Sequence, residues 1–175
     1  MPKLRKMLGS VDDERVIRLM RVIETQSKKT LADWALAYVS NAYLDIYEKA
    51  FPGDHRLRGA VEAVEKHLAG TLSAAALKPF LAAAVCAAKE AEHQPAAMAA
   101  ARAVSTACTV FRTPTSALGF CFYGAAARAY DTLGTEASGA AYDDFAAGEL
   151  EHILASLQRA AAADEPNPVK INWNC

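Results

Sequence analysis

The apolar residues along this chain recur every three or four positions, the spacing that places them on one face of an α-helix. Seven such stretches follow one another, separated by prolines, glycines or capping residues. Their expected starts are, in order, Ser10, Thr30, Asp54, Ser73, Pro95, Ser116 and the end of the loop at Gly139. Strict alternation of apolar and polar residues, which marks a half-buried strand, is missing. The pattern therefore predicts an all-α protein.

The sixth stretch is unusual because it has no polar side. From Ala117 to Ala127 it is apolar or small all the way round, which is typical of a helix surrounded by other helices. Gly119 and Gly124 lie within it and would let neighbouring backbones approach closely. We therefore expect a bundle of about seven helices around a central apolar helix at about 116–130.

The length of 175 residues suits one domain with a substantial core. We expect residues 1–175 to form a single helical domain, with flexible or peripheral ends at 1–10 and 164–175. The side chains predicted to be mostly buried are Trp34, Leu57, Val61, Leu118, Phe120 and Phe122.

Composition supports this interpretation and narrows the class of protein. Roughly a fifth of the residues are alanine, the strongest helix former. With 53% hydrophobic and 22% charged residues, the chain is not of the disordered type. No stretch approaches the ~20 apolar residues of a membrane span, and the basic start lacks the apolar core of a secretory signal. Cysteine spacing is not zinc-like, so we expect a cytoplasmic protein with Cys86, Cys108 and Cys121 as small core residues.

The formal net charge of -1 conceals an uneven distribution. Residues 1–30 carry eight Lys or Arg against four acids, whereas residues 131–165 carry eight acids against Arg159 alone. Such runs are most often solvated helix faces. The functional alternative is an acidic surface that steers a basic partner. Its candidate partner-binding residues are Asp143, Asp144, Glu149 and Glu151.

Two stretches, EAEH and ELEH, place a glutamate three residues before a histidine, as helical di-iron proteins do twice. They define an alternative metal set of Glu90, His93, Glu149 and His152. Helical phase argues against it, because Glu149 falls at the edge of the apolar side of its helix and His152 nearly opposite that side. A further carboxylate that such a site needs is missing from residues 95–130. We therefore expect no metal and no cofactor.

No other catalytic pattern stands out. The four histidines form no HxxxH pair, and the chain lacks a Gly-rich phosphate loop and a nucleophile elbow. A basic helix with interleaved aromatics, which would indicate nucleic-acid binding, is also missing. If the protein were an enzyme, Asp54 and His55 would be further candidates. The candidate residues for a small-ligand pocket, which at this spacing are usually core, are Trp34, Tyr38, Phe120 and Tyr123.

The most distinctive polar cluster follows Pro52-Gly53. Asp54 precedes an apolar-periodic run, so its carboxylate is expected to cap the first amides of the next helix. Arg58 lies four residues further on, within reach of Asp54 on the same face. Arg56 points elsewhere around the helix axis, free to fasten a neighbouring helix or to meet a partner. All three are candidate partner-binding residues, and we favour a structural role for them.

The segment LADWALAYVSNAYLDIYEKAFPGDHRLRGAVEAVEKHLAG has a Trp-Ala pair early in a helix, a Tyr-Glu-Lys ending, and Pro-x-Asp-x-Arg-x-Arg at the next helix start. An Ala-rich segment with a central Ala-Leu-Gly follows. Together they resemble the Imm-5-like family of putative immunity proteins over about residues 31–130. The matched positions are Trp34, Asp54, Arg56, Arg58, Leu118 and Gly119. The chain departs from the family at Leu57 and Thr115-Ser116, where members carry proline and histidines.

The resemblance implies a bacterial cytoplasmic helical protein that neutralises a toxin by binding it. We therefore expect a protein-binding protein without enzymatic activity, whose partner is a protein, in particular a basic toxin. Assembly into a homo-oligomer is compatible with this interpretation, whereas nucleic acid and membrane are not expected partners. The alternative is a small-ligand or metal-binding helical protein.

Overall fold

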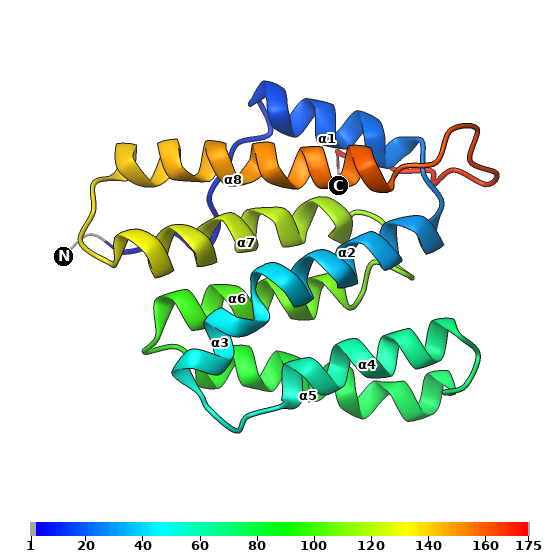
Figure 1. Ribbon diagram of the computed structural model, residues 1–175, viewed down its shortest axis with the longest axis horizontal. Helices are drawn as coiled ribbons and strands as arrows, with labels where there is room; N and C mark the ends of the chain where they lie inside the picture. Colours follow the sequence, from blue (N-terminus) through cyan, green and yellow to red (C-terminus); the bar gives the residue numbers. More distant parts are fainter. Residues whose placement is uncertain (1–2, 175) are drawn as a thin grey trace.

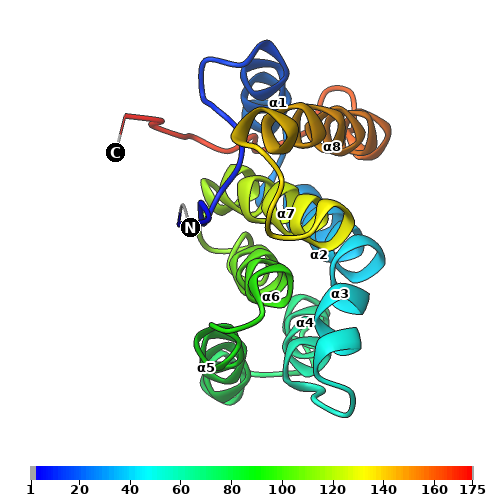
Figure 2. The ribbon, with the colours of Figure 1, turned by 90° about the vertical axis from the view of Figure 1, so that its left-hand side faces the viewer.

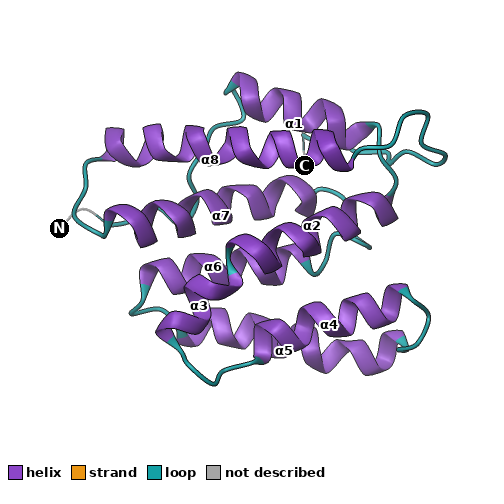
Figure 3. Cartoon of the chain, viewed as in Figure 1, coloured by secondary structure: helices purple, strands orange, loops and turns teal. Residues whose placement is uncertain are grey.

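The computed structural model describes residues 3–174, and within them the chain consists of helices and loops without a strand (Figure 1; Figure 3). The helices are α1 (Glu14–Glu24), α2 (Lys28–Ala42), α3 (Leu44–Ala50), α4 (Arg56–Leu68), α5 (Ala74–Glu90), α6 (Pro95–Ala107), α7 (Ser116–Leu133) and α8 (Gly139–Ala160). The all-α prediction is confirmed, with one helix more than the seven expected. None of the helices in this part of the chain is long and apolar enough to cross a membrane.

The additional helix arises because the predicted second helix breaks at Tyr43. This residue leaves the helical conformation (φ −123°, ψ −26°) and separates α2 from α3. Its side chain is fully buried, and its hydroxyl donates a hydrogen bond to Glu149, 106 residues away. A local hydrophobic pattern carries no information about such a distant contact, so the sequence predicted a continuous helix up to Pro52-Gly53.

Side chains cap several helix starts, and two of the caps differ from the expected residue. Asp13 rather than Ser10 caps α1, and Ser27 rather than Thr30 caps α2. All four are residue types that cap helices well, so residue preference does not choose between neighbours. Ser73 caps α5 as predicted, by accepting a hydrogen bond from a first-turn amide.

The helices form successive layers, as Figure 1 and Figure 2 show together. α1 and α8 lie at one end of the bundle, α4 and α5 lie at the other, and the remaining helices lie between them. The predicted central helix is α7, and it shares the interior with α6, the helix it packs against most extensively. Alanine lines much of α6, and alanine with glycine lines much of α7, which lets the two backbones approach closely.

Five of the six predicted core side chains are buried, and Phe122 is half-buried. The N-terminal segment covers Phe122, because a Cβ atom at Gly9 would lie 2.7 Å from its ring. Cys108 and Cys121 are buried as expected, but the prediction for Cys86 is wrong. Cys86 lies on the outer face of α5, a helix that packs mainly against α4 and α6 and leaves that face open.

Both terminal segments lie on the outside of the bundle and are hydrogen-bonded to it (Figure 1). The Leu8 amide donates to the carbonyl of Phe122 (3.2 Å), and the Leu8 side chain is fully buried. At the other end, the Val169 amide donates to the carbonyl of Gln26 (2.9 Å). The Trp173 indole donates to a carboxylate oxygen of Glu24 in α1 (2.6 Å), so the C-terminal segment is held against α1.

Candidate functional site

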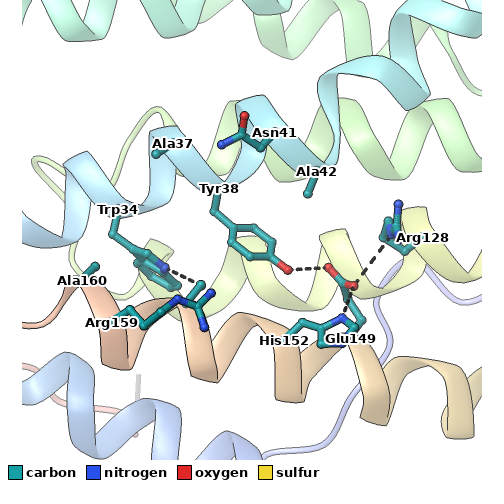
Figure 4. Close-up of a pocket in the computed structure, with 11 residues that line it drawn as sticks. Trp34, Ala37, Tyr38, Asn41, Ala42, Arg128, Glu149, His152, Arg159 and Ala160 are labelled. Atoms are coloured by element: carbon teal, nitrogen blue, oxygen red, sulfur yellow. Dashed lines mark hydrogen bonds and ion pairs between the residues drawn. The ribbon is translucent and has the colours of Figure 1, made fainter.

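A cleft of about 650 Å³ opens between α2, α7 and α8 (Figure 4). The aromatic and polar residues that line it are Trp34, Tyr38 and Asn41 from α2, Arg128 from α7, and Glu149, His152, Ser156 and Arg159 from α8. Two of the four aromatic residues predicted for a ligand pocket therefore meet here. Phe120 is buried behind Trp34, with ring centroids 5.1 Å apart, and Tyr123 does not line this cleft.

Helical phase brings Glu149 to the floor of the cleft. The apolar side of α8 is fully or almost fully buried and consists of Leu150, Ile153, Leu154 and Leu157. Glu149 lies at the edge of this side and is only 4% exposed. The expectation that Glu149 belongs to an acidic outer surface is therefore wrong, because packing of α8 against α2 and α7 covers the edge of its apolar stripe.

Two tyrosine hydroxyls satisfy one oxygen of this buried carboxylate. Tyr38 donates to Glu149 Oε1 at 2.9 Å and Tyr43 donates to the same oxygen at 2.8 Å. Burial, followed by the charge of Glu149, raises the pKa of both tyrosines above the ordinary value. Both hydroxyls therefore stay protonated and serve as fixed donors, which is what an otherwise isolated carboxylate requires.

The Tyr43 ring fits only because residue 124 is glycine. A Cβ atom built on Gly124 would lie 2.2 Å from both Cζ and the hydroxyl oxygen of Tyr43. Gly119, the other glycine predicted to allow a close approach, has no such constraint, since a Cβ atom there would lie 3.5 Å from the Thr106 side chain, an ordinary contact distance. Gly124 in the middle of α7 thus leaves the space through which the Tyr43 side chain, at the junction of α2 and α3, reaches Glu149.

The second oxygen of Glu149 faces two cationic or ionisable groups at longer range. Arg128 Nε lies 3.8 Å away and His152 Nδ1 lies 4.0 Å away, beyond hydrogen-bond distance. Arg128 Nε is buried and has no hydrogen-bond partner. Glu149 therefore holds Arg128 by charge attraction, while the rest of the guanidinium extends toward the cleft (Figure 4).

The arrangement suits binding better than covalent chemistry. Two side chains in the cleft lining carry a hydroxyl, Tyr38 and Ser156. Tyr38 is bound to Glu149, and the Ser156 hydroxyl already makes two hydrogen bonds. Its Oγ accepts from the Trp34 indole (2.9 Å) and donates to the carbonyl of Ile153 (2.7 Å). His152, mostly exposed, has its interaction with Glu149 rather than with Ser156. Nucleophilic catalysis needs a base within hydrogen-bond reach of the nucleophile, and this lining does not provide the pair.

The polar cluster after Pro52-Gly53 forms, but with different pairs from those predicted. The N-cap position of α4 is His55 rather than Asp54, but the Asp54 carboxylate still accepts from the first amide of the helix, that of Arg56 (3.1 Å), and also from the Arg56 guanidinium (2.7 Å). Arg56 continues to Glu90 of α5 at 2.6 Å, so it fastens a neighbouring helix. The predicted Asp54–Arg58 pair is wrong, because Asp54 precedes α4 and is not on its helical face. Arg58 pairs with Glu48 instead.

A tyrosine completes this cluster. Tyr47 of α3 donates its hydroxyl to Asp54 at 2.7 Å. The Arg56 hydrogen bond and the Tyr47 hydroxyl hold the pKa of Asp54 well below its usual range, against the opposing effect of burial. In turn, burial and then the hydrogen bond to Asp54 raise the pKa of Tyr47 to about 12. The cluster therefore ties α3, α4 and α5 together at one corner of the bundle.

The acidic segment is largely paired with other parts of the chain. Asp143 accepts from Arg5 at 2.6 Å, and Glu151 lies 3.3 Å from Arg15, so the basic N-terminal region faces the acidic one. Asp144 is exposed and has no ion pair within residues 3–174. Of the four acidic candidates, Asp144 is thus the one that keeps an unshared surface charge.

The two glutamate–histidine stretches do not meet. Glu90 and His93 belong to the end of α5, whereas Glu149 and His152 belong to α8, and other helices lie between them (Figure 1). Glu90 is engaged by Arg56, and Glu149 by two tyrosines. In the described part of the chain, no group of three His, Cys, Asp or Glu side chains is placed to hold a metal ion.

The sequence did not predict the polar cleft residues Asn41, Arg128, Ser156 and Arg159, nor Tyr43, which bonds to Glu149 without lining the cleft. Tyr43 and Arg128 lie within apolar segments, where an isolated polar group can only be explained by its tertiary partner. The one sequence feature that pointed to this contact was Gly124. A glycine inside an alanine-rich helix indicates that a neighbouring backbone or side chain approaches closely at that position.

The fold and the cleft define an all-α bundle with a side-chain-lined surface cleft suited to binding. The family model for the Imm-5 like putative immunity protein matches residues 21–165, which is most of the chain, and the protein belongs to this family. The match extends beyond residues 31–130, the range of the family motifs in the sequence, and it includes every residue that lines the cleft. No curated protein and no solved structure matches the chain.

Proposed function

We propose that this protein is an immunity protein that neutralises a toxin by binding to it directly, without chemistry of its own. The observation that carries the proposal is the family match over residues 21–165, which includes the helices that build the cleft. The lining of the cleft agrees with it, because its side chains are hydrogen-bonded to one another rather than arranged as nucleophile and base.

The surface candidates fall into two groups under this proposal. Asp54, Arg56 and Arg58 are engaged in ion pairs within the fold, which favours a structural role for them. Among the acidic candidates, Asp144 is the one available to a basic toxin, since Asp143 and Glu151 each face an arginine. Fewer unpaired acidic side chains are therefore available to a strongly basic toxin than the sequence suggested.

The test is a protection assay with a candidate toxin chosen from the genes next to this one. The toxin is expressed in a heterologous host with and without this protein, and growth and co-purification are measured. We expect growth to be restored and the two chains to elute together in a stoichiometric complex. Unrestored growth together with separate elution at low salt would contradict the proposal, because low salt favours charge-assisted association.

A second candidate function is binding of a small ligand in the cleft. Its volume of about 650 Å³ lies within the range of small-molecule sites, roughly 300–1,000 Å³. A thermal-shift screen of small carboxylates, amines and nucleotides would test it, with the variant Ala37→Trp as the control that fills the cleft. A ligand that stabilises the native protein but not this variant would support a small-ligand role.

A further inference from the structure

The cleft presents a charge pattern that toxin binding in general does not explain. Its carboxylate, Glu149, is 4% exposed and is satisfied from inside by two tyrosines. The groups that reach the surface are the guanidiniums of Arg128 and Arg159, the imidazole of His152 and the amide of Asn41. All four can donate hydrogen bonds, and none is an acid. The accessible part of this cleft is therefore suited to an anionic group.

The two arginines occupy different positions and different electrostatic states. Arg128 balances the buried Glu149 at 3.8 Å and is 43% exposed through its outer atoms. Arg159 is exposed and has no ion pair or hydrogen bond within the described residues, so its charge is uncompensated. Figure 4 shows Arg159 near Trp34 at one end of the cleft and Arg128 near Glu149 at the other. An occupant with negative charge at both ends would match this arrangement.

The length of the cleft limits the occupant. Glu149 and Arg159 are ten residues apart on α8, which corresponds to about 15 Å at 1.5 Å per residue. An extended chain covers that distance in about five residues. The wall between the arginines is rigid, because Trp34 is hydrogen-bonded to Ser156 and Tyr38 to Glu149. A short peptide segment can therefore lie along the cleft against fixed aromatic side chains.

We propose that this cleft docks an acidic segment of the toxin, with one carboxylate beside Arg159 and a second beside Arg128. The inference rests on the proposed immunity function and adds the chemistry of the contact. Guanidinium groups bind carboxylates through two parallel hydrogen bonds, and they do so more strongly when water is partly excluded. The toxin can be basic elsewhere, since this contact depends on a local pair of acids.

The experiment is a peptide titration followed by the indole N–H signals of the native protein. The chain has two tryptophans, Trp34 in the cleft wall and Trp173 in the C-terminal segment, so one signal reports on the site and the other is an internal control. The probes are an acetylated five-residue peptide with glutamate at both ends, its counterpart with lysine at both ends, and inorganic phosphate. We expect the glutamate peptide to shift the Trp34 signal with a Kd on the order of 1 mM.

A charge reversal at Arg159 makes the test specific. Arg159 has no ion pair or hydrogen bond among residues 3–174, so Arg159→Glu is expected to leave the melting temperature unchanged and to weaken binding of the glutamate peptide at least tenfold. The matched control is Arg18→Glu, the same change at an exposed position of α1 outside the cleft. It should leave the titration unchanged. Arg128→Gln provides a second variant, with its folding checked by thermal melting.

Each outcome separates the two proposals. A Trp34 shift that is equal with the lysine peptide, or absent with saturating glutamate peptide, would overturn the acidic-segment proposal. An equal shift with phosphate would assign a general anion site instead and overturn it as well. The protection assay stands apart from these results. If the native protein fails to protect, the immunity function fails, whereas protection by Arg159→Glu as strong as that of the native protein would reject only the cleft contact.

Discussion

Tyr43 reaches Glu149 through a gap that Gly124 leaves in α7. The Tyr43 hydroxyl lies 2.8 Å from the carboxylate, and a Cβ atom at position 124 would lie 2.2 Å from that hydroxyl oxygen. One glycine, one tyrosine and one glutamate from distant parts of the chain therefore depend on one another. Because Tyr43 also separates α2 from α3, the same contact accompanies the break that the hydrophobic pattern did not predict.

Gly124→Ala should destabilise the protein although alanine is the better helix former. The methyl group would displace Tyr43 from Glu149, and overpacking of this kind costs about 1–3 kcal/mol. Urea unfolding measures the change. The matched control is Gly148→Ala, at a helical glycine with nothing within 4 Å of its Cβ position, and we expect it to stabilise by about 1 kcal/mol. Equal stabilisation by both alanines would show that Tyr43 moves away freely.

Glu149→Ala should be among the most damaging single changes in α8. It leaves two tyrosine hydroxyls and the Arg128 charge without their buried partner, which costs about 3–5 kcal/mol in comparable pairs. Glu149→Gln should cost less, because its amide oxygen can still accept from the tyrosines. Glu151→Ala, which removes an exposed carboxylate from the same helix, should change the free energy of unfolding by less than about 1 kcal/mol.

The contrast between α7 and α8 shows how far sequence reasoning reaches. The apolar circumference of α7 and the capping serine of α5 are local features, and both were predicted correctly. Burial of Glu149 depends on which neighbouring helices cover the edge of α8. The helical period of the sequence only places Glu149 at the boundary between the buried and the exposed side of that helix. The link from Arg56 to Glu90 joins two helices whose relative position no sequence period encodes. The candidate site was therefore recognised only in part: Trp34 and Tyr38 were predicted as pocket residues, whereas Glu149 and His152 were named for other roles.

Thiol reactivity should separate Cys86 from the two buried cysteines. Burial raises the pKa of Cys108 to about 12 and raises that of Cys121, so both stay protonated and shielded, whereas Cys86 is exposed. In a Cys175→Ser variant, we expect a maleimide to modify one thiol in the native protein and three after denaturation. Rapid labelling of Cys108 or Cys121 in the native protein would indicate that the layer between α6 and α7 opens readily.

The acid stability of the protein should depend on Asp54. Its pKa in the folded protein is well below the ordinary value of 3.8, chiefly because of the Arg56 hydrogen bond. A depressed folded-state pKa contributes stability that is complete above the unfolded value and declines as the pH falls below 3.8. Asp54→Asn removes this contribution while its amide oxygen can still accept from the Arg56 amide.

We therefore expect the Asn variant to be less stable than the native protein by about 1 kcal/mol near neutral pH, since the carboxylate is partly exposed. Below pH 3.8 the difference should shrink by up to about 1.4 kcal/mol per pH unit, until the two proteins unfold together. Urea unfolding at a series of pH values measures it. The control is Asp144→Asn, at an exposed acid without an ion pair in the described part of the chain, and it should show no such trend. A difference in unfolding free energy that stays constant through this pH range would mean that Asp54 acts through its hydrogen-bond geometry rather than through its charge. The ion pair with Arg56 would then contribute little to the stability of the corner where α3, α4 and α5 meet.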